Sequence, residues 1–429
     1  MEKPRLLVGL AIAGLALSAC GGTQGGTSSN KGTIAIGVDL PLSGSEASNG
    51  VPTLNGVKYA VDTTKTVDGF TLVVKSSDDS VNGVHDPQKG AQNVTAFVNN
   101  SQVLGVVGPF NSSVARAEIP ISNRAHLVQI SPANTNQCLT KDVYIPQSLS
   151  GKPDVSCTTA GLPTPAQLRP TGSNNYFRVA TTDDLQGPAM ADYAFNTLHL
   201  TKVGVASDNE VYGKGIADTF TSRFTKDGGT VVKRQDFDTK STNDFRPFLR
   251  GAASAGATAI YFGGTDSNKA CVVRSQAKGI FPATSPYLGG DGIVTGQCIK
   301  DAGDNATGML GTVATVDANQ VSGAKSIIDG FKAKYSSSSD FGAYTMPAYD
   351  CAKILIQAIH KAIQANNGNK PSRQQVLAQM ANVDYTGALG HTSFDSRGDT
   401  TNKVITIYGT KGSPLDWAFV TAIDESKAS

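Results

Sequence analysis

The segment Val103–Ser113, VLGVVGPFNSS, decides the fold class of this chain. Its first five residues, Val103–Val107, are apolar or small, which is typical of a short strand buried on both faces. A Gly-Pro turn follows, and then come Asn111 and Ser112, either of which can cap the first turn of a helix. A buried strand that runs directly into a helix is the repeating unit of a doubly wound α/β protein.

The same alternation extends to both sides of this segment. Further short strands are predicted at Thr33–Leu40, Phe70–Lys75, Leu127–Ile130, Phe177–Val179, Val203–Ser207, Val231–Arg234, Ala259–Phe262 and Tyr287–Gly289. Helices in the first half are predicted at about Pro52–Thr64, from Asp86-Pro87 to Asn99, and at Ser112–Ala125. Two successive series of β/α units predict an α/β fold with two doubly wound, Rossmann-like lobes.

After residue 289 the pattern changes from alternation to a group of helices. The predicted elements are a strand at Met309–Thr315, helices at Lys325–Tyr335, Thr345–Asn366 and Arg373–Val383, and strands at Val404–Tyr408 and Ala418–Thr421. Periodicity alone does not say which lobe these late elements join.

One segment, residues 134–173, interrupts the alternation with five prolines and little periodicity. A loop of this length in a compact domain is normally functional, disordered or held by a cross-link. Cys138 and Cys157 bracket its polar part, so we pair them by position. We also pair Cys271 with Cys298, because each lies near a helix that flanks the same two strands. Spacing alone does not fix connectivity, and Cys351 is expected to be a small buried residue on a helix.

The N-terminus carries the features of a secretory leader. An apolar run, Leu6–Leu17, follows the basic residues Lys3 and Arg5, and it is shorter than the roughly 20 residues that a membrane span needs. Leu17–Cys20, LSAC, resembles the bacterial lipoprotein signal, in which the cysteine is lipidated and becomes the new N-terminus. Residues 20–31 are rich in Gly, Ser and Thr, which is typical of a flexible tether. We therefore expect the folded body outside the cytoplasm, anchored to the membrane through Cys20.

Bulk composition excludes several classes of function. Charged residues make up 17% of the chain and the formal net charge is +2, so no strong field indicates nucleic acid. No metalloprotease, nucleophile-elbow or P-loop motif occurs, and the cysteine spacings do not match zinc sites. The five histidines belong to no catalytic motif: His85, His126, His199, His360 and His391. We expect a binding protein without a cofactor or a metal rather than an enzyme.

Several segments together resemble the branched-chain amino-acid-binding family, the type I periplasmic solute-binding proteins of ABC importers. The matching segments, in family order, are Ile36–Gly44, Asn55–Asp62, Asp86-Pro87, Val106–Ser113, Ile130–Asn136, Asp184 with Gln186-Gly187, Tyr212–Gly215 and Gly387–Asp399. Each match alone is weak, whereas the ordered set spans residues 33 to 410 and is specific.

The resemblance implies a ligand site beyond the carboxyl ends of the strands. In the first lobe, Ser112 contacts a ligand carboxylate at a helix N-terminus, where unpaired N–H groups favour an anion. Ala133 and Thr135 hold the carboxylate and ammonium of the ligand. The alternatives from the residues alone are a helix cap at Ser112 and an ordinary polar turn at Thr135.

In the second lobe, the resemblance places Tyr212 against the ligand and Asp291 opposite its ammonium. A core tyrosine and a Gly-Asp-Gly turn are the alternatives for these two positions. Asp184 is a third candidate, equally consistent with a helix cap, and Thr265 and Asp266 are expected at the same edge. A carboxylate held by one lobe and an ammonium held by the other would favour a closed state.

The resemblance also implies a division of the chain. The expected parts are a leader (1–19), a tether (20–31), lobe 1 (32–181, with the insertion 134–173), lobe 2 (182–315), a return to lobe 1 (316–394) and a return to lobe 2 (395–429), with a multi-strand hinge. The expected function is the monomeric substrate-binding lipoprotein of an ABC importer, which delivers a branched-chain or other small α-amino acid to a membrane permease. The alternative is the same fold binding amides, urea or aromatic acids for import or sensing.

Overall fold

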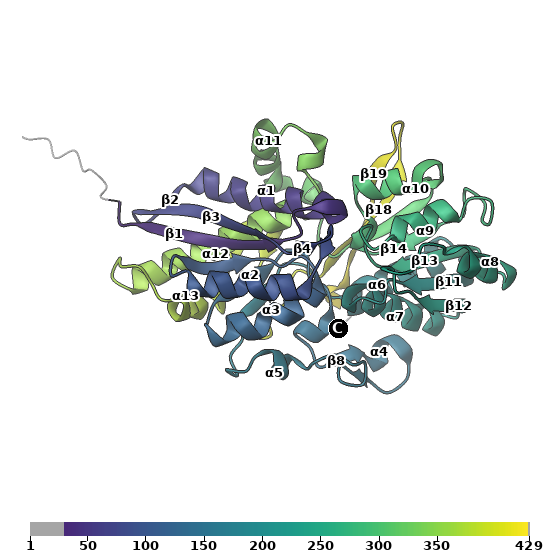
Figure 1. Cartoon of the computed structure of the whole chain (residues 1–429), viewed down its shortest axis with the longest axis horizontal. Helices are drawn as coiled ribbons and strands as arrows, with labels where there is room; N and C mark the ends of the chain where they lie inside the picture. Colours follow the sequence, from purple (N-terminus) through teal and green to yellow (C-terminus); the bar gives the residue numbers. More distant parts are fainter. Residues whose placement is uncertain (1–29, 428–429) are drawn as a thin grey trace, which may run out of the picture.

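The computed structural model describes residues 30–427, which form two α/β lobes side by side (Figure 1). The predicted leader, the lipidation site Cys20 and most of the predicted tether lie outside the described residues.

The first lobe is built on a six-stranded sheet that is parallel except for one edge strand. In spatial order the strands are β10 (Tyr176–Arg178), β7 (Val128–Ser131), β6 (Val103–Val107), β1 (Thr33–Leu40), β3 (Phe70–Asp78) and the antiparallel β2 (Thr66–Val67). The helices packed on this lobe are α1 (Ala47–Thr64), α2 (Pro87–Asn99), α3 (Ser112–Arg124), α11 (Lys325–Lys334), α12 (Thr345–Ala365) and α13 (Arg373–Met380). The sheet is covered on both faces: Phe97 of α2 packs against Gly37, while Leu355 of α12 packs against Gly105.

The second lobe contains a seven-stranded sheet. In spatial order the strands are β12 (Thr230–Asp236), β11 (Lys202–Ser207), β13 (Ala259–Gly263), β14 (Tyr287–Gly289), β15 (Met309–Val313), β18 (Val404–Lys411) and β19 (Asp416–Asp424), the last two antiparallel. Its helices are α6 (Asp183–Asp192), α7 (Val211–Lys226), α8 (Arg246–Ser254), α9 (Ala270–Gln276) and α10 (Gly296–Ala302). Late parts of the chain therefore complete both lobes.

The chain crosses between the lobes where β10 leads into α6, after β15, and before β18. These crossing segments are bonded to one another: Thr181 N–H donates to the Ala314 carbonyl at 2.7 Å. Arg178 Nε donates to Asp399 Oδ1 at 2.7 Å, and both side chains are fully buried. A paired and buried ion pair of this kind fixes the position of the segments that carry it.

The insertion 134–173 forms two short helices, α4 (Gln147–Ser150) and α5 (Pro165–Leu168), and a hairpin of β8 (Val143–Ile145) and β9 (Val155–Ser156). Figure 1 shows α4 and β8 lying below α7 of the second lobe. Tyr144 Oη donates to Asp218 Oδ2 at 2.8 Å, so the insertion of the first lobe contacts the second.

Both cysteine pairings made from position are present in the structure. Cys138 is bonded to Cys157 within the insertion, and Cys271 is bonded to Cys298 between α9 and α10. Cys351 is a buried free thiol on α12, as expected.

One helix starts earlier than the sequence predicts. We expected a start at Pro52, since proline suits the first turn, but α1 begins at Ala47 and contains Pro52. Gly50 explains the difference, because its backbone packs so closely on Pro41 that an added Cβ would lie 1.8 Å from the Pro41 carbonyl oxygen. Tertiary packing extends the helix beyond the start that local sequence favours.

Candidate functional site

The predicted site residues lie at the carboxyl ends of parallel strands, except Tyr212 and Asp184, which lie in the first turns of α7 and α6. Ser112 is the first residue of α3, and Thr135 lies in the loop after β7. Asp291 follows β14 and Thr265 follows β13. Ligands of open α/β sheets bind at these strand ends.

On the second lobe, Asp291 is the centre of a buried hydrogen-bond network. Gln186 Nε2 donates to Asp291 Oδ1 at 2.7 Å, and Tyr212 Oη donates to the same oxygen at 3.0 Å. The Tyr212 hydroxyl also accepts the Gly292 N–H at 3.3 Å, which fixes the loop after β14. Burial raises the pKa of Asp291, and its bonds to Gln186 and Tyr212 oppose that shift. All of its hydrogen-bond donors among the described residues are neutral.

On the first lobe, side-chain hydroxyls and backbone N–H groups hold the loop after β7. Ser131 Oγ accepts the N–H groups of Ala133 (3.2 Å) and Asn134 (2.9 Å), which shapes the turn. Ser112 Oγ accepts the Asn136 N–H at 3.3 Å, so Ser112 connects this loop to the start of α3. Thr135 is 1% exposed, and its hydroxyl lies against the carboxyl group of Asp183.

Further buried polar groups lie beside these residues. The Tyr344 hydroxyl bonds to Asp291, and the carboxyl group of Asp183 bonds to Thr135. Gln186 Oε1 has no hydrogen-bond partner within residues 30–427. Buried polar groups in native proteins are nearly always bonded. This buried polar cluster around Asp291 and Thr135 is the part of the interlobe region that best suits a polar ligand.

The structure does not bring Asp184 together with the other predicted residues. Asp184 forms an ion pair with Lys141 at 2.8 Å and lines a different cavity. Its neighbour Asp183 is the carboxylate that lies beside Thr135 and Asp291, and burial raises its pKa strongly. The spacing of Asp183, Gly187 and Met190 on one buried helix face is the signal that could have selected Asp183.

Sequence reasoning also missed a polar contact between the lobes. The buried carboxylate of Glu46 accepts hydrogen bonds from His85 Nδ1 at 2.8 Å and from Asn111 Nδ2 at 2.6 Å, both in the first lobe. Ser267 Oγ of the second lobe donates to the same carboxylate at 3.1 Å. Burial lowers the pKa of His85, but the charge and hydrogen bond of Glu46, together with the charges of Glu210 and Asp79, outweigh burial and raise the pKa to about 9. We call Glu46, His85 and Ser267 the interlobe latch.

Thr265 and Asp266 lie beside this latch. Thr265 Oγ1 is 2.8 Å from Ser267 Oγ, and Asp266 Oδ2 accepts from Ser48 Oγ of the first lobe at 3.3 Å. Burial raises the pKa of Asp266 to about 7. These two residues thus belong to the lobe–lobe contact, directly next to the region around Asn111 and Ser112.

The described part of the chain shows no group of three or more His, Cys, Asp or Glu side chains that could hold a metal ion. Among residues 30–427, no helix combines the length and the apolarity that a membrane span requires.

Known proteins share the sequence pattern and the fold of this chain. Residues 33–412 match the sequence profile of the periplasmic binding protein family. The chain belongs to this family. A curated relative, Leu/Ile/Val-binding protein homolog 3 of Brucella melitensis, is 27% identical over 383 residues, which cover 87% of this chain and 93% of the relative.

Two solved structures share the fold at lower identity. A leucine-binding protein from Thermotoga maritima is 24% identical with a TM-score of 0.74, covering 92% of this chain and 100% of that one. A solute-binding protein of an ABC transporter from R. palustris, in complex with 4-hydroxybenzoate, is 17% identical with a TM-score of 0.72, covering 91% and 97%. These family members are binding proteins rather than enzymes.

Proposed function

We propose that this chain is the extracytoplasmic substrate-binding component of an ABC importer and that it captures an α-amino acid between its two lobes. The observation that carries the proposal is the buried carboxylate of Asp291, whose side-chain hydrogen-bond donors Gln186, Tyr212 and Tyr344 are all neutral. A buried charge without a counter-charge is costly. A ligand ammonium supplies that counter-charge.

The first lobe supports the other end of the ligand. The N-terminus of the thirteen-residue helix α3, with Ser112 and Thr135 close by, suits a carboxylate. An ammonium on one lobe and a carboxylate on the other define a zwitterion that binds both lobes at once. Such a ligand stabilises the closed arrangement over an open one, and a permease in the membrane would recognise that arrangement.

An aromatic acid is the second candidate, because a family member with this fold is bound to 4-hydroxybenzoate. A monocarboxylate would leave Asp291 without a counter-charge, so the charges of this site favour the amino acid. We propose a branched-chain or other small α-amino acid as ligand, as in the relatives named for Leu, Ile and Val.

Isothermal titration calorimetry with leucine, isoleucine, valine, urea and benzoate tests this function. We expect an amino acid to bind with a dissociation constant of about 1 μM or below. Asp291→Asn should weaken that binding by about 30-fold or more, because removing one partner of a buried charge pair costs about 2–5 kcal/mol. Asp304→Asn, an exposed aspartate of the same lobe, is the matched control. Binding of benzoate or urea alone would overturn the amino-acid assignment.

Anchoring through Cys20 is part of the same proposal. It rests on the sequence LSAC behind an apolar run and on the Gly/Ser/Thr-rich residues that follow. Metabolic labelling with a radioactive fatty acid tests it: the wild-type chain should be labelled, and Cys20→Ala should not. We also propose a monomer, which light scattering of the purified protein checks.

A further inference from the structure

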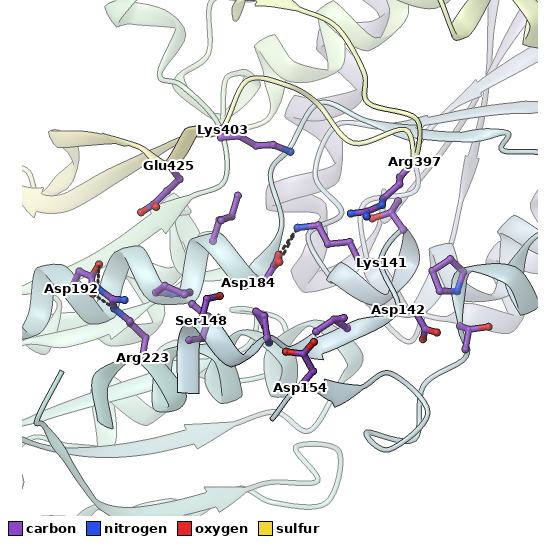
Figure 2. A pocket seen from close by; sticks show the side chains of 18 of the residues that line it. Lys141, Asp142, Ser148, Asp154, Asp184, Asp192, Arg223, Arg397, Lys403 and Glu425 are labelled. Carbon is purple, nitrogen blue, oxygen red and sulfur yellow. Dashed lines mark hydrogen bonds and ion pairs between the residues drawn. The ribbon is translucent and has the colours of Figure 1, made fainter. Parts of the chain in front are cut away.

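A cavity lies beside the insertion, away from the candidate ligand-binding residues. It has a volume of about 740 Å³, within the range of small-molecule sites. Its walls come from the insertion, from α6 and α7 of the second lobe, and from Arg397 and Lys403 in the last crossing segment (Figure 2). None of Ser112, Thr135, Tyr212 or Asp291 lines it.

One edge of this cavity carries three cations. Figure 2 shows Lys141, Arg397 and Lys403 around the same end of the cavity. Lys141 Nζ is bonded to Asp184 at 2.8 Å and to Thr182 Oγ1 at 3.0 Å. Neither the Lys403 ammonium nor the Arg397 guanidinium forms a hydrogen bond or ion pair with any residue of the described chain. This edge therefore has two cationic groups that are not bonded to a partner.

The carboxylates nearby do not neutralise both of these cations. Asp399 is already paired with the buried Arg178. Asp395 accepts hydrogen bonds from the backbone N–H groups of Arg397 and Asp399 at 2.9 and 3.0 Å. Its charge also attracts the Lys403 ammonium, but without a hydrogen bond between them. Burial lowers the pKa of Lys403, which is the expected effect on a cation that is partly removed from water. The edge has an excess of one positive charge.

The other residues that line the cavity restrict the charge and polarity of a ligand that could bind there. Apolar side chains from the insertion and from α6, including Leu149 and Leu185, form much of the wall. The carboxylates of Asp142, Asp154 and Glu425 also line the cavity, and burial beside Asp192 raises the pKa of Glu425. A second negative charge on the ligand would meet these carboxylates at a cost.

We propose that this cavity is a binding site for a small organic monocarboxylate with an uncharged or cationic body. The carboxylate lies against Lys403 and Arg397, and the body lies against the apolar wall. A charge-assisted bond to Arg or Lys is among the stronger polar contacts in proteins. Both lobes and a crossing segment form the walls of the cavity.

Calorimetric titration of the purified protein with sodium butyrate, γ-aminobutyrate and succinate tests the site. We expect butyrate or γ-aminobutyrate to bind, and succinate to bind about tenfold more weakly because of its second carboxylate. Lys403→Ala and the exposed Arg397→Gln should each weaken binding about tenfold or more, whereas Lys278→Ala, an exposed lysine of the second lobe, should not. Circular dichroism confirms that each variant is folded.

Asp291→Asn separates this site from the cleft. Monocarboxylate binding that survives Asp291→Asn and is lost in Arg397→Gln supports the proposal, whatever ligand the cleft takes. Three results overturn it: no heat of binding at about 10 mM of any probe, binding that is lost only in Asp291→Asn, and succinate binding as tightly as butyrate.

Discussion

Replacement of His85 tests the electrostatics of the interlobe latch. His85 is 8% exposed and Glu46 is fully buried, with 2.8 Å between His85 Nδ1 and Glu46 Oε2. The charge of Glu46 raises the pKa of His85 from 6.5 to about 9, although burial alone would lower it. Protonated His85 is therefore favoured in the folded state.

The sign and size of the effect follow from that shift. Between pH 6.5 and about 9 the folded chain keeps the His85 proton and the unfolded chain does not, so the free energy of unfolding falls as pH rises. A shift of this size corresponds to about 3 kcal/mol, which is fully present below pH 6.5 and lost as pH rises through 9. That is a large part of the 5–15 kcal/mol typical of a folded domain.

Urea unfolding of the wild type and His85→Asn, measured from pH 6 to pH 10, gives the difference profile. We expect the wild type to be more stable by about 3 kcal/mol at pH 6 and the difference to shrink steadily toward pH 10. His360→Asn is the matched control, because His360 also lies 2.8 Å from an aspartate but is half exposed, and should cost about 1 kcal/mol or less. A wild-type minus His85→Asn difference that stays constant over this range would refute the pairing.

Three further changes test the fold and the site. Gly56→Ala should destabilise the first lobe by about 1–3 kcal/mol in thermal melting, because the new Cβ would lie 2.0 Å from a backbone carbonyl oxygen of α12. Gly323→Ala is the control, since Gly323 has open space around it, and its effect should stay within about 0.5 kcal/mol. Replacing Cys138 and Cys157 together by serine should lower the free energy of unfolding by about 3 kcal/mol in urea, from the 19-residue separation that the disulfide closes. Tyr212→Phe should weaken amino-acid binding about tenfold by calorimetry, since it removes a hydroxyl that holds the cleft carboxylate.

The alternation of strands and helices was predictable because parallel strands buried on both faces are continuous apolar runs. Val103–Val107 and Tyr287–Gly289 are strands with the same bounds in sequence and structure. Short pairings without such a run were not predictable. The hairpin of β16 (Tyr385–Gly387) and β17 (Gly390–Thr392) has only three residues in each strand, and its register depends on a turn rather than on a hydrophobic pattern.

Candidate site positions at strand ends and helix starts can be selected from the sequence, and their role in ligand binding stays a prediction. Asp291 and Tyr212 lie 79 residues apart in sequence, and the structure joins them at 3.0 Å. The interlobe latch could not be predicted in the same way. Glu46 ends a short 3-10 helix (Gly44–Glu46) and His85 lies in the two-residue strand β5 (Val84–His85). They are 39 residues apart, and segments this short carry no periodicity that would predict their contact.

The charges of the cleft and the rigidity of the hinge lead to one account of closure. The crossing segments are held together by the buried Arg178–Asp399 pair. Between the lobes, the neutral hydroxyl of Ser267 donates a hydrogen bond to the carboxylate of Glu46. The negative charge of that carboxylate is already balanced by His85. Asp291 is different, because no cation of the described residues is bonded to it. Under the proposed function, the ligand ammonium supplies the counter-charge that Asp291 lacks among the described residues. We therefore expect the closed arrangement to be favoured when that ligand is bound.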